Sequence, residues 1–234
     1  MRAHPESLRG RSHASRVREL KTVRKRVYVS DNVRRTMQRL TEQVLEHVAG
    51  LPEGVPVSAK ELLHLGSRAA VDQALSRLAR RGRLLRAGRG LYVRPIETRF
   101  GSRSPSVESL VQAIAGSKGE TIASHGAAAA NALGLTTQVP TRSVYLTSGK
   151  SRQLQLGKQI VEFRHAPRWQ LAMADRPAGE AIRALAWLGE AKAGEALRTL
   201  RRRLPASTLN EIVSVRPRLP TWLAEQVSRL VMNG

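Results

Sequence analysis

The sequence predicts an α+β protein that is mainly helical, and three patterns lead to this fold class. Apolar residues recur at helical steps of three and four over residues 32–49 and 67–82. Short stretches that mix apolar and polar residues around glycines predict β-hairpins at 84–93 and 152–165. Four further helical stretches follow residue 167, divided by glycine and proline. We therefore expect a small helical unit with a hairpin, followed by a second unit with a small sheet and several helices.

Charge is the most unusual property of the composition. The 234 residues carry a formal net charge of +22 and include no cysteine. The charge indicates a polyanionic partner, first of all nucleic acid, although a compositionally biased genome is an alternative explanation. The lack of cysteine excludes thiolate zinc sites, thiol nucleophiles and disulfides. Because no apolar run approaches the length of a membrane span and the first residues lack a secretory signal, we expect a cytoplasmic protein.

Residues 1–30 are expected to form a flexible basic arm. Nine arginines and lysines stand against only Glu6 and Glu19, and large apolar side chains are almost absent before Val17. Such a segment would add electrostatic affinity for phosphates, the alternative being a solvated tail without a role.

Residues 31–95 are expected to contain three helices in front of a hairpin. The first covers residues 32–49, and a short second helix is expected at 59–65. The third is capped by Ser67 and ends at Gly82. Inward-facing positions are expected at Leu62, Leu63 and Leu65 of the second helix and at Val71, Ala74, Leu75 and Leu78 of the third.

The stretch from Arg80 to Pro95, RRGRLLRAGRGLYVRP, predicts a β-hairpin with arginines near its tip. Gly88 and Gly90 can take the positive φ that a tight turn needs, and the apolar residues on either side would form the strands. Two helices, a basic helix and a basic hairpin follow one another in the order of a winged helix-turn-helix, in which the hairpin is the wing. We therefore predict that residues 31–95 bind DNA, the alternative being a winged domain used for protein contacts.

The third helix and the hairpin supply the candidate DNA contacts. Exposed residues near the start of a recognition helix meet base edges, where Gln73 can pair with adenine and Arg68 with guanine. Residues further along the helix, and those of the hairpin, would bind phosphates or the adjacent minor groove. The candidate residues are Ser67, Arg68, Asp72, Gln73, Ser76, Arg77, Arg80, Arg81, Arg86 and Arg89.

Residues 96–105 combine turn formers with little apolar periodicity, which predicts a linker to a second domain at 106–234. Ser106 would cap its first helix, and HGAAAANALGL predicts a helix of small residues that packs closely. Strands are expected at ETIAS, RSVYLTS and, as a hairpin about Gly157-Lys158, RQLQLGKQIVEFRH. Helices are expected at 178–191, 193–204, 207–214 and 220–232, with Trp187 and Trp222 in the core.

The stretch GAAAANALGLTTQVPTRSVYLTSGKSRQLQLGKQIVEFRHAP, residues 126–167, resembles the antitoxin of AbiE-type (type IV) toxin-antitoxin systems, the AbiEi-like family. The resemblance covers about residues 34–234, including the wing strand Gly90-Leu91-Tyr92. It implies an N-terminal winged helix that represses its own promoter by binding inverted repeats, on which we expect two copies of the protein. It further implies a C-terminal antitoxin domain that counters a nucleotidyltransferase-like toxin, in phage defence, without a stable complex. Composition and periodicity predict only the DNA-binding half.

Several positions match the family within that stretch, and most of them would be structural. The polar ones, Asn131, Thr137 and Gln138, are candidates for the antitoxin function, although capping a turn or satisfying a strand is the favoured alternative. Lys150 and Arg152 of the following basic turn complete the candidate motif. Ahead of the alanines, where the family would have a Ser-Gly pair, this chain has Ser124-His125-Gly126, and a solvated or hydrogen-bonding role is expected for His125. The matching residues are Ala129, Asn131, Ala132, Leu133, Gly134, Leu135, Thr137, Gln138 and Pro140.

No pattern in the sequence predicts catalysis, a metal or a cofactor. SGKS, Ser148 to Ser151, follows a strand, but a P-loop would need glycine where Val144 stands and a helix after the turn. The histidines and carboxylates lack metal-binding spacing, and no nucleophile motif is present. Two alternatives to an antitoxin remain open: a stand-alone winged-helix regulator with a ligand-sensing or assembly domain, and an enzyme or RNA-binding factor that uses the SGKS turn.

Overall fold

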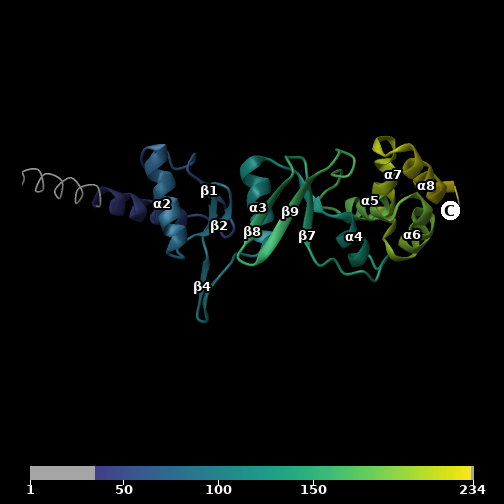
Figure 1. The fold of residues 1–234 in the computed structure, drawn as a ribbon. Coiled ribbons are helices and arrows are strands. Elements are labelled where there is room, and N and C mark those ends of the chain that lie inside the picture. The colour runs from purple at the N-terminus through teal and green to yellow at the C-terminus, as the bar shows by residue number, and fades with distance from the viewer. Residues whose placement is uncertain (1–34, 233–234) are drawn as a thin grey trace, which may run out of the picture.

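The computed structural model describes residues 35–232, which form an elongated α+β fold (Figure 1). A unit of helices and a small sheet lies at one end, a four-stranded sheet lies in the middle, and a group of helices lies at the other end. The mainly helical α+β class agrees with the sequence prediction. The expected basic arm, residues 1–30, and the expected start of the first helix at residue 32 lie outside the described residues. None of the described helices is long and apolar enough to cross a membrane.

Two helices pack together in the N-terminal unit. One covers residues 35–49 and the other, α2, covers Arg68–Arg80. Ser67 caps α2 as predicted, because its Oγ accepts a hydrogen bond from the backbone N of Ala70 at 3.4 Å. The predicted inward face of α2 is confirmed as well. The shared core includes Leu40, Val44, Val48, Val71, Ala74, Leu75 and Leu78.

The prediction of a short helix at residues 59–65 is wrong, since these residues form consecutive turns after β1 (Val57–Ser58). Their amides donate to carbonyls three residues back, as the N of Leu62 does to the O of Ala59 at 3.2 Å. This is the tighter 3₁₀ pattern, and so short a segment gains too few hydrogen bonds to offset the nucleation of an α-helix. Leu62 is fully buried, but Leu63 is 46% exposed and does not face inward.

The predicted hairpin forms the rest of the first sheet. β2 (Leu85–Gly88) and β3 (Leu91–Val93) pair antiparallel, and β1 pairs with the other edge of β3. Gly90 takes the positive φ expected of the turn, at +67°. Gly88 does not have a positive φ. It instead lets β2 approach the central sheet closely, since a Cβ there would lie 3.3 Å from the side chain of Leu154. The hairpin therefore packs against the second half of the chain.

A second β-hairpin occupies the stretch expected to be an irregular linker. β4 (Ile96–Thr98) pairs antiparallel with β5 (Gly101–Arg103). Figure 1 shows this hairpin extending away from the body of the molecule. Since most of its residues are exposed, its strands lack the alternation of apolar and polar residues that would reveal them in the sequence.

α3 (Val107–Lys118) connects the N-terminal unit to the central sheet. It begins as predicted at Ser106, whose Oγ accepts a hydrogen bond from the N of Ser109 at 3.0 Å. The backbone N of Ser106 in turn donates to Oε1 of Glu53 at 3.0 Å. A Cβ on Gly54 would lie 2.5 Å from the backbone of Ser109, so only glycine allows this loop to rest on the first turn of α3.

The central sheet contains β6 (Ile122–Ser124), β7 (Ser143–Thr147), β9 (Gln159–His165) and β8 (Arg152–Leu156), in that order. β7 and β9 run parallel and the other neighbours antiparallel. The predicted β8–β9 hairpin is confirmed. One core joins this sheet to α3 and to the β2–β3 hairpin. It contains Ala87, Val93, Val107, Leu110, Ile114, Leu154, Leu156, Val161 and Phe163.

Helices make up the remaining end of the molecule, and the predicted helices after residue 167 are confirmed to within a few residues. A Cβ on Gly126 would lie 2.4 Å from the backbone O of Arg183, which confirms the close packing expected of the small-residue helix. Trp222 packs against the helical core, but Trp187 is 38% exposed and was wrongly assigned to it. The helices are α4 (Gly126–Ala132), α5 (Pro177–Leu188), α6 (Glu190–Arg203), α7 (Ala206–Ser214), the 3₁₀ turn Arg216–Arg218 and α8 (Thr221–Met232).

Candidate nucleic-acid interface

α2 carries most of the predicted DNA-binding residues on its solvent side. Its apolar residues fill the opposite face, so the helical repeat leaves the polar residues open to an external partner. Arg77 differs from the others in being half-buried. The exposed residues are Ser67, Arg68, Asp72, Gln73, Ser76, Arg80 and Arg81.

Near the start of α2, Arg68 and Asp72 form an ion pair. Nε of Arg68 lies 3.4 Å from Oδ2 of Asp72, and both side chains are largely exposed. An exposed pair of this kind contributes little free energy, so a partner can separate it at small cost. Gln73 is exposed beside the pair and makes no side-chain hydrogen bond with any described residue, so its amide is open to a partner.

The arginines near the end of α2 line an open groove between this helix and the helix at 35–49. Arg77 and Arg81 were predicted to bind phosphates, and both are part of its lining. Arg83, just beyond the helix, lines it too and was missed by the sequence prediction. The signal for Arg83 was present, because it belongs to the same run of arginines without an acidic neighbour. The three guanidinium groups outnumber the one carboxylate in the lining, that of Glu42, so the groove can still bind phosphate groups.

Arg86 and Arg89 of the β2–β3 hairpin are exposed, as the prediction requires. Between them, Ala87 is buried in the core that the hairpin shares with the central sheet. The hairpin is thus held against the body of the protein and presents its arginines from a fixed base.

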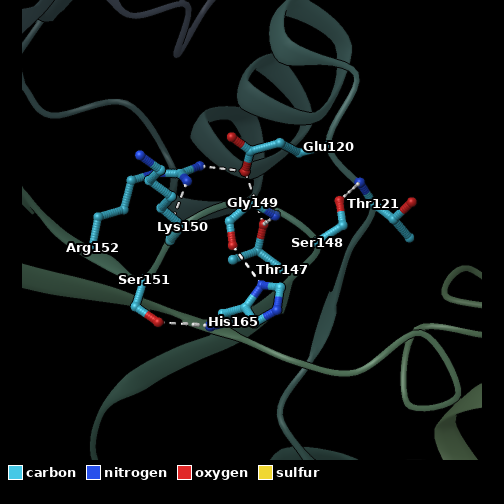
Figure 2. Close-up of polar contacts among 9 residues, drawn as sticks. All are labelled: Glu120, Thr121, Thr147, Ser148, Gly149, Lys150, Ser151, Arg152 and His165. Atoms are coloured by element: carbon cyan, nitrogen blue, oxygen red, sulfur yellow. Dashed lines mark hydrogen bonds and ion pairs between the residues drawn. The ribbon is translucent and has the colours of Figure 1, made fainter.

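A second group of predicted residues lies at the TSGKS turn, residues 147–151 between β7 and β8 (Figure 2). The carboxylate of Glu120 faces this turn. Its Oε2 accepts hydrogen bonds from Oγ1 of Thr147 at 2.8 Å and from Nη2 of Arg152 at 2.6 Å. Gly149 leaves the space for it, since a Cβ there would lie 2.4 Å from Cδ of Glu120. A carboxylate of the protein therefore already receives hydrogen bonds from Thr147 of the turn and from Arg152 just after it.

Hydrogen bonds within the protein use most of the polar groups of the TSGKS turn. The backbone N of Gly149 donates to Oγ1 of Thr147 at 3.0 Å, and its O lies 2.9 Å from Nδ1 of His165. The Oγ of Ser151 accepts a hydrogen bond from the backbone N of His165 at 2.9 Å. Because the strand β8 follows where a P-loop has a helix, the turn lacks the geometry of a P-loop.

The two predicted residues at this turn differ in their surroundings. Arg152 is half-buried, with its guanidinium 4.8 Å from the ring centre of Phe163, and it is paired with Glu120. Burial by itself would raise the pKa of Glu120, but the hydrogen bonds from Arg152 and Thr147 outweigh it and lower the pKa. Arg152 therefore stabilises the turn, whereas Lys150 is exposed and available to a partner.

The predicted polar residues of the 126–140 stretch are separate from the TSGKS turn. Asn131 is half-buried, and its Nδ2 donates to the O of Thr136 at 3.4 Å. Thr137 and Gln138 are exposed, and the backbone N of Gln138 donates to Oγ1 of Thr136 at 3.2 Å. Within residues 35–232 no hydrogen bond joins these residues to the turn, so the predicted motif does not form one hydrogen-bonded site.

His125 caps α4, in line with the hydrogen-bonding role expected for it. Its Nδ1 accepts a hydrogen bond from the backbone N of Ala127 at 3.2 Å. Burial, followed by the positive charge of Arg164, lowers the pKa of His125. The lowered pKa favours the neutral ring, which is the form that can accept this bond.

No three His, Asp or Glu side chains in the described part of the chain come close enough to hold a metal ion. Comparison with known proteins adds a family but no function: the family model described as "Family of unknown function (DUF6088)" matches residues 43–204. No curated protein and no solved structure matches the chain.

Proposed function

This chain belongs to the DUF6088 family, and we propose that it binds double-stranded DNA through α2 and represses transcription from its own promoter. The observation that carries the proposal is the order of side chains on the exposed face of α2. Residues suited to reading bases, Arg68 and Gln73, precede the arginines at 77, 80 and 81. A recognition helix points its N-terminal residues at base edges, so this order would place the arginines near the phosphates.

The elements around α2 support the same proposal. A helix, a compact turn segment, α2 and a hairpin with a third strand follow one another, an order typical of winged helix-turn-helix proteins. Residues 59–65 take the place of the second helix, and Leu62 anchors them in the core in its stead. We interpret β2–β3 as the wing.

Asp72 fits this proposal although its charge repels phosphates. Its ion pair with Arg68 spans one turn of α2 and keeps the guanidinium near the helix surface until DNA replaces the contact. A carboxylate can also accept a hydrogen bond from the amino group of cytosine, so Asp72 would add base preference in place of general affinity.

For the second half of the chain, we propose the antitoxin function of a type IV system, on the resemblance of residues 126–167 to AbiEi-like antitoxins. The partner would be a nucleotidyltransferase-like toxin encoded next to this protein. Many small residues of the resembling stretch pack α4 on α5, so antitoxicity is expected to involve the exposed residues Thr137, Gln138 and Lys150. A stand-alone regulator, in which this half senses a ligand or mediates assembly, is the alternative.

Growth in the presence of the toxin distinguishes the two functions considered for the second half of the chain, antitoxin and stand-alone regulator. Full-length protein is expected to restore growth of cells that express the neighbouring toxin, and so is the Gln73→Ala variant, because repression and antitoxicity use different surfaces. If the full-length protein does not restore growth, the antitoxin proposal is wrong and the stand-alone regulator is favoured.

The first experiment measures binding to the DNA directly upstream of its own gene, and to scrambled DNA of equal length, by fluorescence anisotropy at physiological salt. A specific repressor is expected to prefer the upstream DNA by about a thousandfold or more. Equal affinity for both would contradict sequence-specific repression and leave only general nucleic-acid binding.

Substitutions on α2 and in the wing should have different effects on this preference. Gln73→Ala or Arg68→Ala is expected to cost roughly 1 to 3 kcal/mol on the upstream DNA and to reduce the preference, because each removes a base contact. Arg86→Ala or Arg89→Ala is expected to weaken binding to both DNAs alike. If the two pairs of variants behaved identically, the assignment of α2 as the recognition helix would be wrong.

A further inference from the structure

The tip of the β4–β5 hairpin carries a phenylalanine in full contact with solvent. Phe100 is 87% exposed, whereas Phe163, the other of the chain's two phenylalanines, is completely buried. A single exposed apolar side chain is common on protein surfaces, so the exposure of Phe100 gains meaning only from its position at the tip of a projecting hairpin and from the residues beside it.

Hydrogen bonds within the hairpin fix the backbone of its tip. Thr98 Oγ1 donates to the O of Gly101 at 2.7 Å and accepts from the N of Phe100 at 3.2 Å. The register pairs Thr98 with Gly101, so Arg99 and Phe100 alone form the tip. The tip is thus ordered before any partner arrives, which lowers the entropy lost on binding.

The base of the hairpin is fixed to the rest of the protein. Pro95 and Pro105, which flank it, are both buried. Nη1 of Arg103 lies 3.7 Å from Oε1 of Glu53, in the loop that rests on α3. The hairpin therefore projects from the junction of the N-terminal unit and the central sheet with a defined direction (Figure 1).

The charge at the tip indicates what kind of molecule it meets. The guanidinium of Arg99 lies 4.6 Å from the ring centre of Phe100, and both side chains are exposed. No acidic residue lies between Thr98 and Arg103, and the hairpin's one carboxylate, that of Glu97, lies in β4 before the tip. An arginine beside an apolar wedge is the combination with which proteins enter the minor groove of DNA, where arginine meets the negative potential and the wedge separates neighbouring bases.

We propose that the β4–β5 hairpin enters the minor groove of the bound DNA and inserts Phe100 between two base pairs, which kinks the duplex. This inference rests on the proposed DNA-binding function. It gives the two hairpins different roles. The β2–β3 hairpin is held against the central sheet through Ala87 and Gly88 and offers arginines to phosphates, whereas the β4–β5 hairpin extends freely and deforms the DNA.

The test measures DNA bending together with affinity. Upstream DNA labelled at both ends with a donor and an acceptor dye is titrated with full-length wild-type protein and with Phe100→Ala. Wild-type protein is expected to raise energy transfer, as a bend of about 20 to 90° would. Phe100→Ala is expected not to raise energy transfer and to bind about tenfold more weakly. It should keep its preference for upstream over scrambled DNA.

Two further variants make the result specific. Phe100→Leu should restore bending, because an apolar wedge and not an aromatic ring is required. Val139→Ala removes another exposed apolar side chain, 73% exposed and outside the hairpin, and should bind and bend like the wild type. If Phe100→Ala bends the upstream DNA as the wild type does, the hairpin proposal is overturned although DNA binding stands. If wild-type protein shows no preference for upstream DNA, it is the proposed function that fails.

Discussion

At the scale of single residues, Glu120 shows how a turn that looks suited to anions is occupied by a carboxylate of the protein itself. Its carboxylate accepts hydrogen bonds from Thr147 and from the half-buried Arg152, and it packs against Gly149. The protein thus supplies its own anion to the TSGKS turn. The sequence could not reveal this, because a pair that joins the end of α3 to the start of β8 leaves no periodic signal.

The lowered pKa of Glu120 predicts how the stability of the protein depends on pH. Because the folded-state pKa lies below the ordinary value of 4.5, ionised Glu120 stabilises the fold above that pH, and this stabilisation is lost as pH falls through the folded-state pKa. Glu120→Ala should lower the free energy of unfolding at pH 7 by roughly 1 to 3 kcal/mol, since it removes hydrogen bonds to a charged group.

Urea denaturation at pH 7 and at a series of pH values below 4.5 checks this prediction. The difference between wild type and Glu120→Ala should shrink as the carboxyl becomes protonated. Glu46→Ala, at an exposed position of the helix at 35–49, provides the control and should change little at any pH. A difference that stays constant at every pH would show that packing, and not the charge of Glu120, stabilises the turn.

At the scale of elements, the sequence correctly predicts the helices and strands whose buried residues recur at regular spacing on one face. α2 and α3 bury residues at helical spacing and begin at the predicted serine caps, and β8–β9 turns where expected. The β4–β5 hairpin buries little, so no apolar pattern identified it, and the candidate site at its tip was missed with it. Residues 59–65 have enough leucines for a helix but not the length, which is why pattern alone predicted them wrongly.

The sequence predicts that the small residues of α4 pack closely, and the structure adds that their partner is α5. A Cβ on Gly126 would lie 2.4 Å from the O of Arg183 and 2.5 Å from Cβ of Trp187. Gly126→Ala should therefore force the helices apart and cost about 1 to 3 kcal/mol of stability. Gly116→Ala, in α3, is the matched control, because its Cβ would meet nothing within 4 Å.

Thermal unfolding of the two alanine variants checks the prediction. Gly116→Ala should stabilise the protein by roughly 0.5 to 1 kcal/mol, because alanine restricts the unfolded chain and favours the helix. A loss of stability in Gly126→Ala together with a gain in Gly116→Ala would support close packing of α4 on α5. An equal gain of stability in both variants would show that α4 and α5 lie further apart than in this structure.

At the scale of the whole molecule, the two halves are joined more firmly than their sequences indicate. A linker was expected at 96–105, but Glu53 binds the start of α3 and the β2–β3 hairpin shares a core with the central sheet. These contacts join residues far apart in the sequence, in loops and edge strands without a repeating pattern. The order of the units was therefore predictable, whereas their packing required the three-dimensional structure.

The charge of the whole molecule, +22, leads to a prediction about salt. The sequence predicts five arginines of the proposed interface as phosphate contacts, and the slope below counts these five: Arg77, Arg80, Arg81, Arg86 and Arg89. If each neutralises one phosphate, two copies on an inverted repeat release enough counterions for a slope of about −9 in a plot of log affinity against log salt. A single copy would give about half of that slope.

Anisotropy titrations over a range of salt concentrations measure this slope directly. Arg81→Ala should change it from about −9 to about −7, because each copy loses one phosphate contact. Arg229→Ala, which removes the same charge from α8 at the far end of the molecule, should leave the slope unchanged. A wild-type slope near −2 would contradict the arginine interface. Equal changes for both variants would mean that the overall charge, and not the face around α2, binds the DNA.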